Sequence, residues 1–352
     1  MSHIILTRSV PMGGLMKASV WVAPERVEFR EVERPEVCSG EALVKVAYAG
    51  ICGTDLSMYV GRHPRAKPPL IMCHEFVGTI VRADGDAFPA GTPIAINPLL
   101  SCGVCYPCTN GIPHLCQRLG LLGIDRDGGF AEYALVPLHT VRPLPPSLPL
   151  AKAALIEPLA VACHAVRASN LRVGDVTAVL GAGPIGIMTA QVARLAGARR
   201  VFVSEIAPKR LSIARELGFQ VVDAGEQSIV QAIKDATHGI GVPVAFETAG
   251  VQATITDVRQ IVRIGGQILQ VGMPKTPPTL DLVALTYAEI TIRPIRVYRE
   301  EDFSAAIAIA AAGKVDLSTP VTHILPLEEL DHAIQLALKA SDVGKILLQP
   351  NA

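Results

Sequence analysis

The 352-residue sequence lacks an excess of either charge, because 32 lysine and arginine residues balance 32 acidic ones. Nucleic acid and anionic membrane surfaces are therefore not expected partners. The sequence also lacks internal repeats, low-complexity segments and any apolar run long enough to span a bilayer. No secretory signal is recognisable, so we expect a cytoplasmic protein with reduced thiols. The first fifteen residues have no clear pattern, and we interpret them as an extension or as a start site assigned too early.

The chain is long enough for two domains, and its pattern changes near residue 170. Before about residue 150, short strands such as 42–47 alternate with glycine and proline turns. Later strands alternate with helices, which indicates a parallel sheet. Strands are predicted at 176–181, 200–205, 219–223, 242–247, 267–272 and 289–293, and helices at 184–196, 208–217, 302–312 and 327–339. We predict an α/β fold in which a doubly wound domain (166–296) interrupts a mostly β domain (1–165 and 297–352).

Four of the eight cysteines lie within fifteen residues, at Cys102, Cys105, Cys108 and Cys116. Their spacing allows four thiolates to close a tetrahedral shell around one zinc ion. A disulfide cluster or four unrelated thiols are the alternatives, and the tight spacing disfavours both. A closed shell leaves no position for substrate, so we predict a structural zinc site here and chemistry elsewhere.

A glycine-rich segment lies between a predicted strand and a predicted helix. It consists of Gly181, Ala182, Gly183, Pro184, Ile185 and Gly186. Such glycines permit a tight turn and close approach of a pyrophosphate to the helix N-terminus. Glu205 ends the next strand, and its carboxylate is expected to bind ribose hydroxyls and repel a 2′-phosphate, which favours NAD over NADP. Lys209 and Arg210 follow; they either weaken this preference or, as we favour, are exposed charges on a surface helix.

The segments 50–55 (Gly-Ile-Cys-Gly-Thr-Asp) and 74–78 (His-Glu-Phe-Val-Gly) resemble the zinc-binding halves of the zinc-dependent medium-chain alcohol dehydrogenase family. The resemblance runs from about Met16 to the end of the chain and includes the cysteine cluster and the segment 128–133. It implies a Rossmann domain and a GroES-like catalytic domain. The segment 157–161 (Glu-Pro-Leu-Ala-Val) resembles the polyol branch, which includes sorbitol and butanediol dehydrogenases. Threonine dehydrogenases would have an Asp-Pro-Phe-type segment there.

The resemblance also implies a catalytic zinc site. Cys52 and His74 would supply sulfur and nitrogen ligands, and Glu75 or Glu157, or both in turn, would supply oxygen. An open site needs about three such ligands and keeps one position for substrate or water. Thr54 corresponds to the hydroxyl that relays the substrate proton.

Several positions depart from the family pattern. Ser57 stands where a histidine is usual, so the outer part of the proton relay must use water or another residue. Cys73 replaces a glycine and is either a spectator, which we favour, or an extra thiol beside the zinc. Arg296 is our choice for a substrate-contacting arginine, although neighbouring arginines are alternatives. Cys163 and His164 are expected to follow a helix and to pack in the core.

We therefore predict reversible, NAD-dependent oxidation of a secondary alcohol in a polyol or vicinal diol, with two zinc ions per chain. Zinc would lower the pKa of the substrate hydroxyl, and NAD would accept the hydride. A threonine or aldose dehydrogenase is the enzymatic alternative. A catalytically inactive nucleotide-binding protein is disfavoured because Cys52, His74 and Glu75 are all present. A homotetramer or homodimer is expected.

Overall fold

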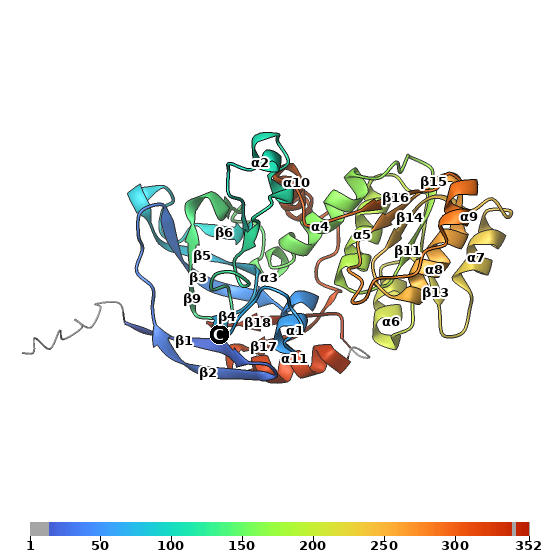
Figure 1. Cartoon of the computed structure of the whole chain (residues 1–352). Helices are drawn as coiled ribbons and strands as arrows, with labels where there is room; N and C mark the ends of the chain where they lie inside the picture. The colour runs from blue at the N-terminus through green and yellow to red at the C-terminus, as the bar shows by residue number, and fades with distance from the viewer. Residues whose placement is uncertain (1–13, 340–342, 352) are drawn as a thin grey trace, which may run out of the picture.

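The computed structural model describes residues 14–339 and 343–351. Most of the N-terminal segment without a pattern lies outside the described residues. Two sheet-based halves lie side by side, with helix α4 (Ile156–Arg167) between them (Figure 1). Within the described residues, no helix is long and apolar enough to cross a membrane.

The first half is built on antiparallel sheets. Strands β1 (Leu15–Ala23), β2 (Arg26–Glu33) and β4 (Leu70–Ile71) form a small sheet in the order β2-β1-β4. The larger sheet has the order β10-β6-β5-β3-β18-β17, and β9 also pairs with β3. Its strands are β3 (Glu41–Gly50), β5 (Glu75–Ala83), β6 (Pro93–Ile96), β9 (Tyr133–Pro137), β10 (Val141–Pro143), β17 (Val321–Pro326) and β18 (Lys345–Gln349). The chain thus returns to this sheet after leaving it, as the predicted interrupted domain requires.

The second half contains a six-stranded parallel sheet in the order β13-β12-β11-β14-β15-β16. The strands are β11 (Val176–Leu180), β12 (Arg200–Glu205), β13 (Gln220–Asp223), β14 (Val242–Glu247), β15 (Val262–Gln270) and β16 (Thr291–Pro294). Every residue of β11 is buried, as expected for a strand covered on both faces. The predicted alternation is confirmed, although β15 begins five residues earlier than expected. The strand order reverses between β11 and β14, which makes their carboxyl ends a topological switch point.

Helices cover the parallel sheet and join it to the first half. They are α5 (Pro184–Leu195), α6 (Pro208–Glu216), α7 (Ile229–Ala236), α8 (Gln252–Ile261) and α9 (Leu282–Tyr287). Helix α4 packs against both α5 and α10 (Glu300–Ala311), and one apolar core runs through all three. The short α3 (Leu150–Ala153) precedes α4, and α11 (Leu330–Lys339) packs on the first half. The position expected for Cys163 and His164 was wrong, because both lie within α4, where they are buried.

Candidate functional site

The four clustered cysteines converge in a loop region around helix α2 (Tyr106–Thr109) and the 3-10 turn η2 (Pro113–Leu115). Their sulfur atoms all lie within 4.8 Å of one another, and each is a free thiol. Backbone N–H groups of Val104 and Cys105 lower the pKa of Cys102 to about 5. Burial and the neighbouring Cys105 sulfur raise the pKa of Cys108 to about 11. Thiolates this close together repel one another, and a bound divalent cation would offset that repulsion. Four sulfur donors therefore fit a closed zinc site.

A second cluster joins Cys52, His74 and Glu75, whose ligand atoms also lie within 4.8 Å of one another. Cys52 is the N-cap residue of helix α1 (Gly53–Tyr59) and lies two residues after the end of β3. His74 directly precedes β5, and Glu75 is the first residue of that strand. Pairing of β3 with β5 places Gly50 opposite Glu75, and this register brings the three side chains together. One sulfur, one nitrogen and one oxygen donor fit an open zinc site.

The electrostatic surroundings of this second cluster favour a cation. Burial opposes the charged form of His74, but the Cys52 sulfur and nearby carboxylates outweigh it and raise the pKa of His74 well above its usual value. Among the residues that the structure describes, His74 Nδ1 is buried without a hydrogen-bond partner. Asp55, which is fully buried, accepts the backbone N–H groups of Cys52 (2.8 Å) and Cys73 (3.3 Å) and so joins the two ligand segments.

Glu157 lies in the first turn of α4, near the second cluster but outside the three residues that form it. Burial raises its pKa to about 7, and the charges of His74 and Glu75 also act on it. The buried hydroxyl of Tyr298, a residue that sequence reasoning missed, lies beside the Glu157 carboxyl group. A carboxyl group in this position can exist in either protonation state near neutral pH.

Lys345 is the most unexpected neighbour of the second cluster. Its side chain is 2% exposed, and its ammonium group forms an ion pair with Glu75 and donates to the carbonyl of Ile51 (2.8 Å). Sequence reasoning missed this residue, because a lysine in an apolar strand gives no local sign of a partner 270 residues away. The available signal in the sequence for burial of Lys345 was the apolar segment Ile346-Leu347-Leu348 that follows it, which is buried in the structure.

The remaining predicted residues of the catalytic site occupy different positions. Thr54 Oγ1 lies 3.8 Å from Cys52 Sγ, and Ser57 lies one turn further along α1. The sulfur of Cys73 contacts the carbonyl oxygens of Gly50 (3.6 Å) and Glu75 (3.4 Å). Cys73 is not one of the three residues that form the second cluster. Arg296 is exposed, and within the described residues it forms no ion pair.

The glycine-rich segment has the geometry of a dinucleotide cradle. Gly181 has a φ of +102°, and a Cβ on Gly186 would lie 2.0 Å from the Gly181 carbonyl oxygen. A Cβ on Gly183 would meet only Arg210, at 4.0 Å, so this position is open to a ligand. The Glu205 carboxylate accepts the backbone N–H of Ala182 (2.8 Å) and therefore lies against the cradle. These residues fit a bound dinucleotide.

Arg210 differs from our expectation of an exposed charge on a surface helix. Its guanidinium group is half-buried, lies 4.0 Å from the Glu205 carboxylate and donates to the Val343 carbonyl (3.0 Å). Lys209 is exposed, as expected. Arg210 therefore lies beside the cradle, next to Glu205 and Gly183.

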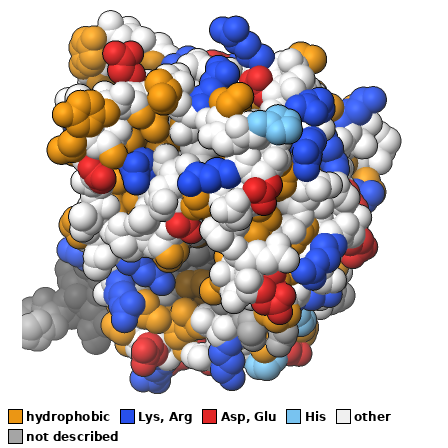
Figure 2. Space-filling model, turned by 90° about the vertical axis from the view of Figure 1, so that its right-hand side faces the viewer, with side chains coloured by type: hydrophobic (Ala, Val, Ile, Leu, Met, Phe, Trp, Pro, Cys, Tyr) orange, Lys and Arg blue, Asp and Glu red, His pale blue; other side chains and the backbone are white. Residues whose placement is uncertain are grey.

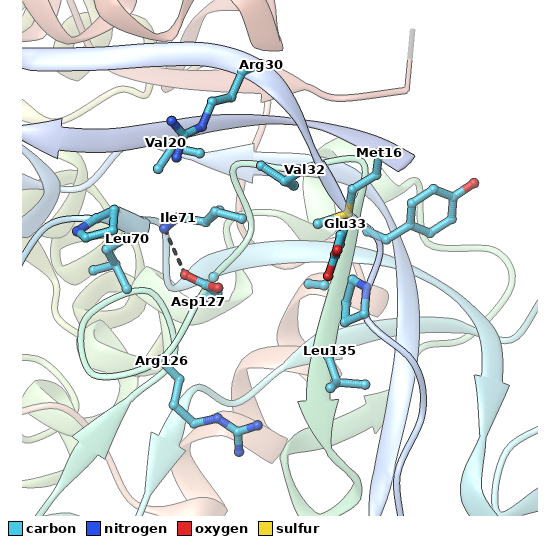
Figure 3. A pocket seen from close by; sticks show the side chains of 15 residues that line it. Met16, Val20, Arg30, Val32, Glu33, Leu70, Ile71, Arg126, Asp127 and Leu135 are labelled. Atoms are coloured by element: carbon cyan, nitrogen blue, oxygen red, sulfur yellow. Dashed lines mark hydrogen bonds between the residues drawn. The ribbon is translucent and has the colours of Figure 1, made fainter. Parts of the chain in front are cut away.

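A groove in the first half of the molecule lies apart from the candidate active site. It has a volume of about 370 Å³ and lies over β1, β2 and β9. Figure 3 shows Arg30 and Arg126 on opposite sides of apolar side chains that include Val32 and Ile71. A smaller cavity of about 280 Å³ lies at the carboxyl ends of β14 and β15, near the dinucleotide cradle.

Comparison with known proteins agrees with this geometry. Residues 38–146 match the family model described as alcohol dehydrogenase GroES-like domain, and residues 184–312 match that of zinc-binding dehydrogenase. The chain belongs to the zinc-dependent medium-chain alcohol dehydrogenase family. The GroES-like and Rossmann-like architecture expected from the sequence is thereby confirmed.

Three similar members of this family illustrate its range. The 2-dehydro-3-deoxy-L-galactonate 5-dehydrogenase of Pseudoalteromonas atlantica is 36% identical, over 84% of this chain and 87% of its own length. The sorbitol dehydrogenase of Bacillus subtilis is 33% identical, over 98% and 100%. A zinc-binding dehydrogenase from Sinorhizobium meliloti, solved with NADP bound, is 31% identical with a TM-score of 0.89, over 96% and 100%.

Proposed function

We propose that this dehydrogenase oxidises a secondary alcohol of a polyol or sugar acid, with zinc at Cys52, His74 and Glu75 and with NAD as the hydride acceptor. The observation that carries this proposal is the convergence of these three donors within 4.8 Å, beside the buried Glu157. Zinc supplies a Lewis acid that acidifies a hydroxyl group, and NAD supplies the oxidant.

The side chains around the cluster suit removal of a proton. Thr54 places a hydroxyl group beside Cys52, at the end of the helix nearest the cluster. Ser57 lies on the same helix and does not titrate near neutral pH, so the proton has to continue through water or another group. Lys345 forms a buried ion pair with Glu75, which orients that carboxylate.

The substrate class rests on two of the similar proteins. One acts on a sugar acid and another on sorbitol, and both substrates carry several adjacent hydroxyl groups. The segment 157–161 also matches the polyol branch in its sequence. We infer that the substrate of this chain has vicinal hydroxyl groups, and Arg296 remains our candidate for contacting them.

The test is reduction of NAD by the purified zinc-loaded protein with a panel of substrates. We expect the substrate with the highest kcat/KM to be one of these polyols, diols and sugar acids: sorbitol, xylitol, 2,3-butanediol, gluconate, idonate and galactonate. Threonine is the comparison, and a threonine kcat/KM above that of every polyol and sugar acid would show that the substrate class is wrong. NADH binding without turnover of any alcohol would favour the catalytically inactive alternative.

We further propose that two copies of the chain associate through the edge of the parallel sheet. Among the described strands, none pairs with the outer edge of β16. Nearby, helix α9 exposes Leu282 (66%), Val283 (66%) and Tyr287 (86%). An open strand edge beside exposed apolar side chains favours pairing with a second copy. Figure 2 shows lysine and arginine mixed with acidic side chains on this side of the molecule, so charge repulsion does not prevent the approach.

A further inference from the structure

Glu247 is a buried acidic residue for which no role could be predicted from the sequence. It ends β14, at the switch point of the parallel sheet, and its side chain is inaccessible to solvent (0% exposed). Its Oε1 accepts the backbone N–H groups of Ala249 (2.9 Å) and Gly250 (2.8 Å) and the hydroxyl of Thr254 (2.7 Å). Its Oε2 accepts the side-chain amide of Gln270. The carboxylate therefore anchors the loop after β14.

The same residue also anchors the loop after β15. Its backbone carbonyl accepts the N–H groups of Val271 (2.8 Å) and Gly272 (2.9 Å). Gln270, held by the carboxylate, donates in addition to the Gly272 carbonyl (2.8 Å). The two loops touch, because a Cβ on Gly272 would lie 2.4 Å from the Gly250 nitrogen and 2.8 Å from Glu247 Oε2. Glu247 thus fixes the loops after β14 and β15 relative to each other.

The following residue extends this arrangement to the dinucleotide cradle. Thr248 Oγ1 donates to the carbonyl oxygens of Leu180 (2.9 Å) and Gly181 (3.1 Å). A Cβ on Gly186 would lie 2.7 Å from the same hydroxyl oxygen. The loops after β11, β14 and β15 are therefore fixed relative to one another at the carboxyl edge of the sheet.

The position of these loops at the carboxyl edge of the sheet indicates a role in dinucleotide binding. In doubly wound sheets a dinucleotide lies across the carboxyl ends of the strands, with its two halves on either side of the switch point. Glu205 and the cradle serve the half over β11 and β12. The cavity at the other half, of about 280 Å³, is lined by the anchored Ala249 and Gly250 and by Met273.

We propose that Glu247 is a positioning residue for the half of the dinucleotide that lies over β14 and β15; this role rests on the proposed NAD-dependent function. Both carboxylate oxygens of Glu247 accept hydrogen bonds, and each of the partners donates an N–H or O–H group. A neutral substitute leaves at least one buried donor without a partner, and the loops can then separate. Glu247 acts on the cofactor through these loops.

The decisive variant is Glu247→Gln, which keeps the side-chain size but turns a donor toward Gln270. We expect the Kd for NADH, measured by its fluorescence, to rise about tenfold, which corresponds to about 1.4 kcal/mol, close to the lower end of the range for a hydrogen bond to a charged group. The KM for NAD should rise similarly, while kcat at saturating NAD stays within about threefold and zinc content is unchanged. If this variant does not fold, Gln270→Leu removes the hydrogen bond between Gln270 and Glu247 and should also raise the Kd for NADH.

A matched control separates positioning from stability. Gln267 is also buried on β15, and its side chain accepts the backbone N–H of Asn170 (2.8 Å). Gln267→Leu should lower Tm and leave the Kd for NADH unchanged. An unchanged Kd in Glu247→Gln, or an equal rise in Gln267→Leu, would overturn the proposed role. A wild-type chain that binds neither NADH nor NADPH would refute the proposed function itself.

Discussion

At the scale of single residues, the second metal cluster depends on a charge balance with Lys345. Glu75 and Lys345 are each 2% exposed, so neither charge is solvated by water. Burial opposes ionisation of Lys345, but the Glu75 carboxylate outweighs it and raises the pKa of the ammonium group. The ion pair orients the Glu75 carboxylate, which lies beside Cys52 and His74 as an oxygen donor.

Lys345→Met tests this balance. Removing one partner of a buried ion pair leaves the other charge uncompensated, and we expect a loss of roughly 3–5 kcal/mol in the free energy of unfolding of the zinc-free protein. Urea unfolding measures this loss, and Lys314→Met, at an exposed position, is the control and should change stability little. Unchanged stability in Lys345→Met would show that Glu75 does not depend on the lysine.

A second prediction at this scale concerns the choice between NAD and NADP, which we attribute to Glu205. Its carboxylate lies against the cradle, bonded to the N–H of Ala182, and would repel a 2′-phosphate. We expect a higher kcat/KM with NAD than with NADP, and Glu205→Ala should narrow the ratio by about tenfold or more, because Arg210 is then free to bind the phosphate. Equal use of both cofactors by the wild-type protein would contradict this prediction.

At the scale of elements, the cysteine cluster has to hold a segment with little regular structure. Helix α2 has four residues and η2 has three, too few to fold independently. Val104 is 70% exposed and Tyr106 on α2 is 71% exposed, so these two apolar side chains add little packing to this region. We therefore infer that an ion bound by the four thiolates supplies most of its stability.

Cys105→Ser and Cys52→Ser should separate the two zinc sites. Elemental analysis of the wild-type protein should give about two zinc ions per chain, and each variant should lose one. Cys105→Ser should make the segment 102–116 sensitive to proteases, whereas Cys52→Ser should keep the fold and lose turnover. Full turnover in Cys52→Ser would show that the second cluster is not the catalytic one.

At the scale of the whole molecule, association through β16 would join two parallel sheets. Tyr287→Asp places a charge on the exposed apolar face of α9, and burying that charge in an interface costs several kcal/mol. We expect light scattering to show a dimer or tetramer for the wild-type protein and smaller species for the variant. Leu15→Asp, at an exposed position on β1, is the control and should leave the assembly unchanged. A monomeric wild-type protein would refute the proposed interface.

Much of the fold and of the candidate site could be predicted because the signals are local in sequence. Strand and helix alternation beyond residue 170, the glycine cradle and the four clustered cysteines all depend on neighbours within a few turns of chain. Short-range spacing decides which neighbouring donors can face one ion or one phosphate, so these features could be predicted from the sequence alone. The donor set Cys52, His74 and Glu75 was instead predicted from the resemblance to zinc-dependent dehydrogenases, and pairing of β3 with β5 brings it together.

Tertiary structure decided the features that need distant segments to meet. Lys345 reaches Glu75 only because β18 returns to pair with β3, and Gln270 reaches Glu247 only because β15 lies beside β14. Arg210 is half-buried because its helix faces the Val343 carbonyl. Pairing partners between strands are chosen by the packing of whole sheets, and that choice has no local signature. The sequence by itself therefore determined the local elements and predicted the candidate donors, and the tertiary structure decided which buried charges and loops surround those donors.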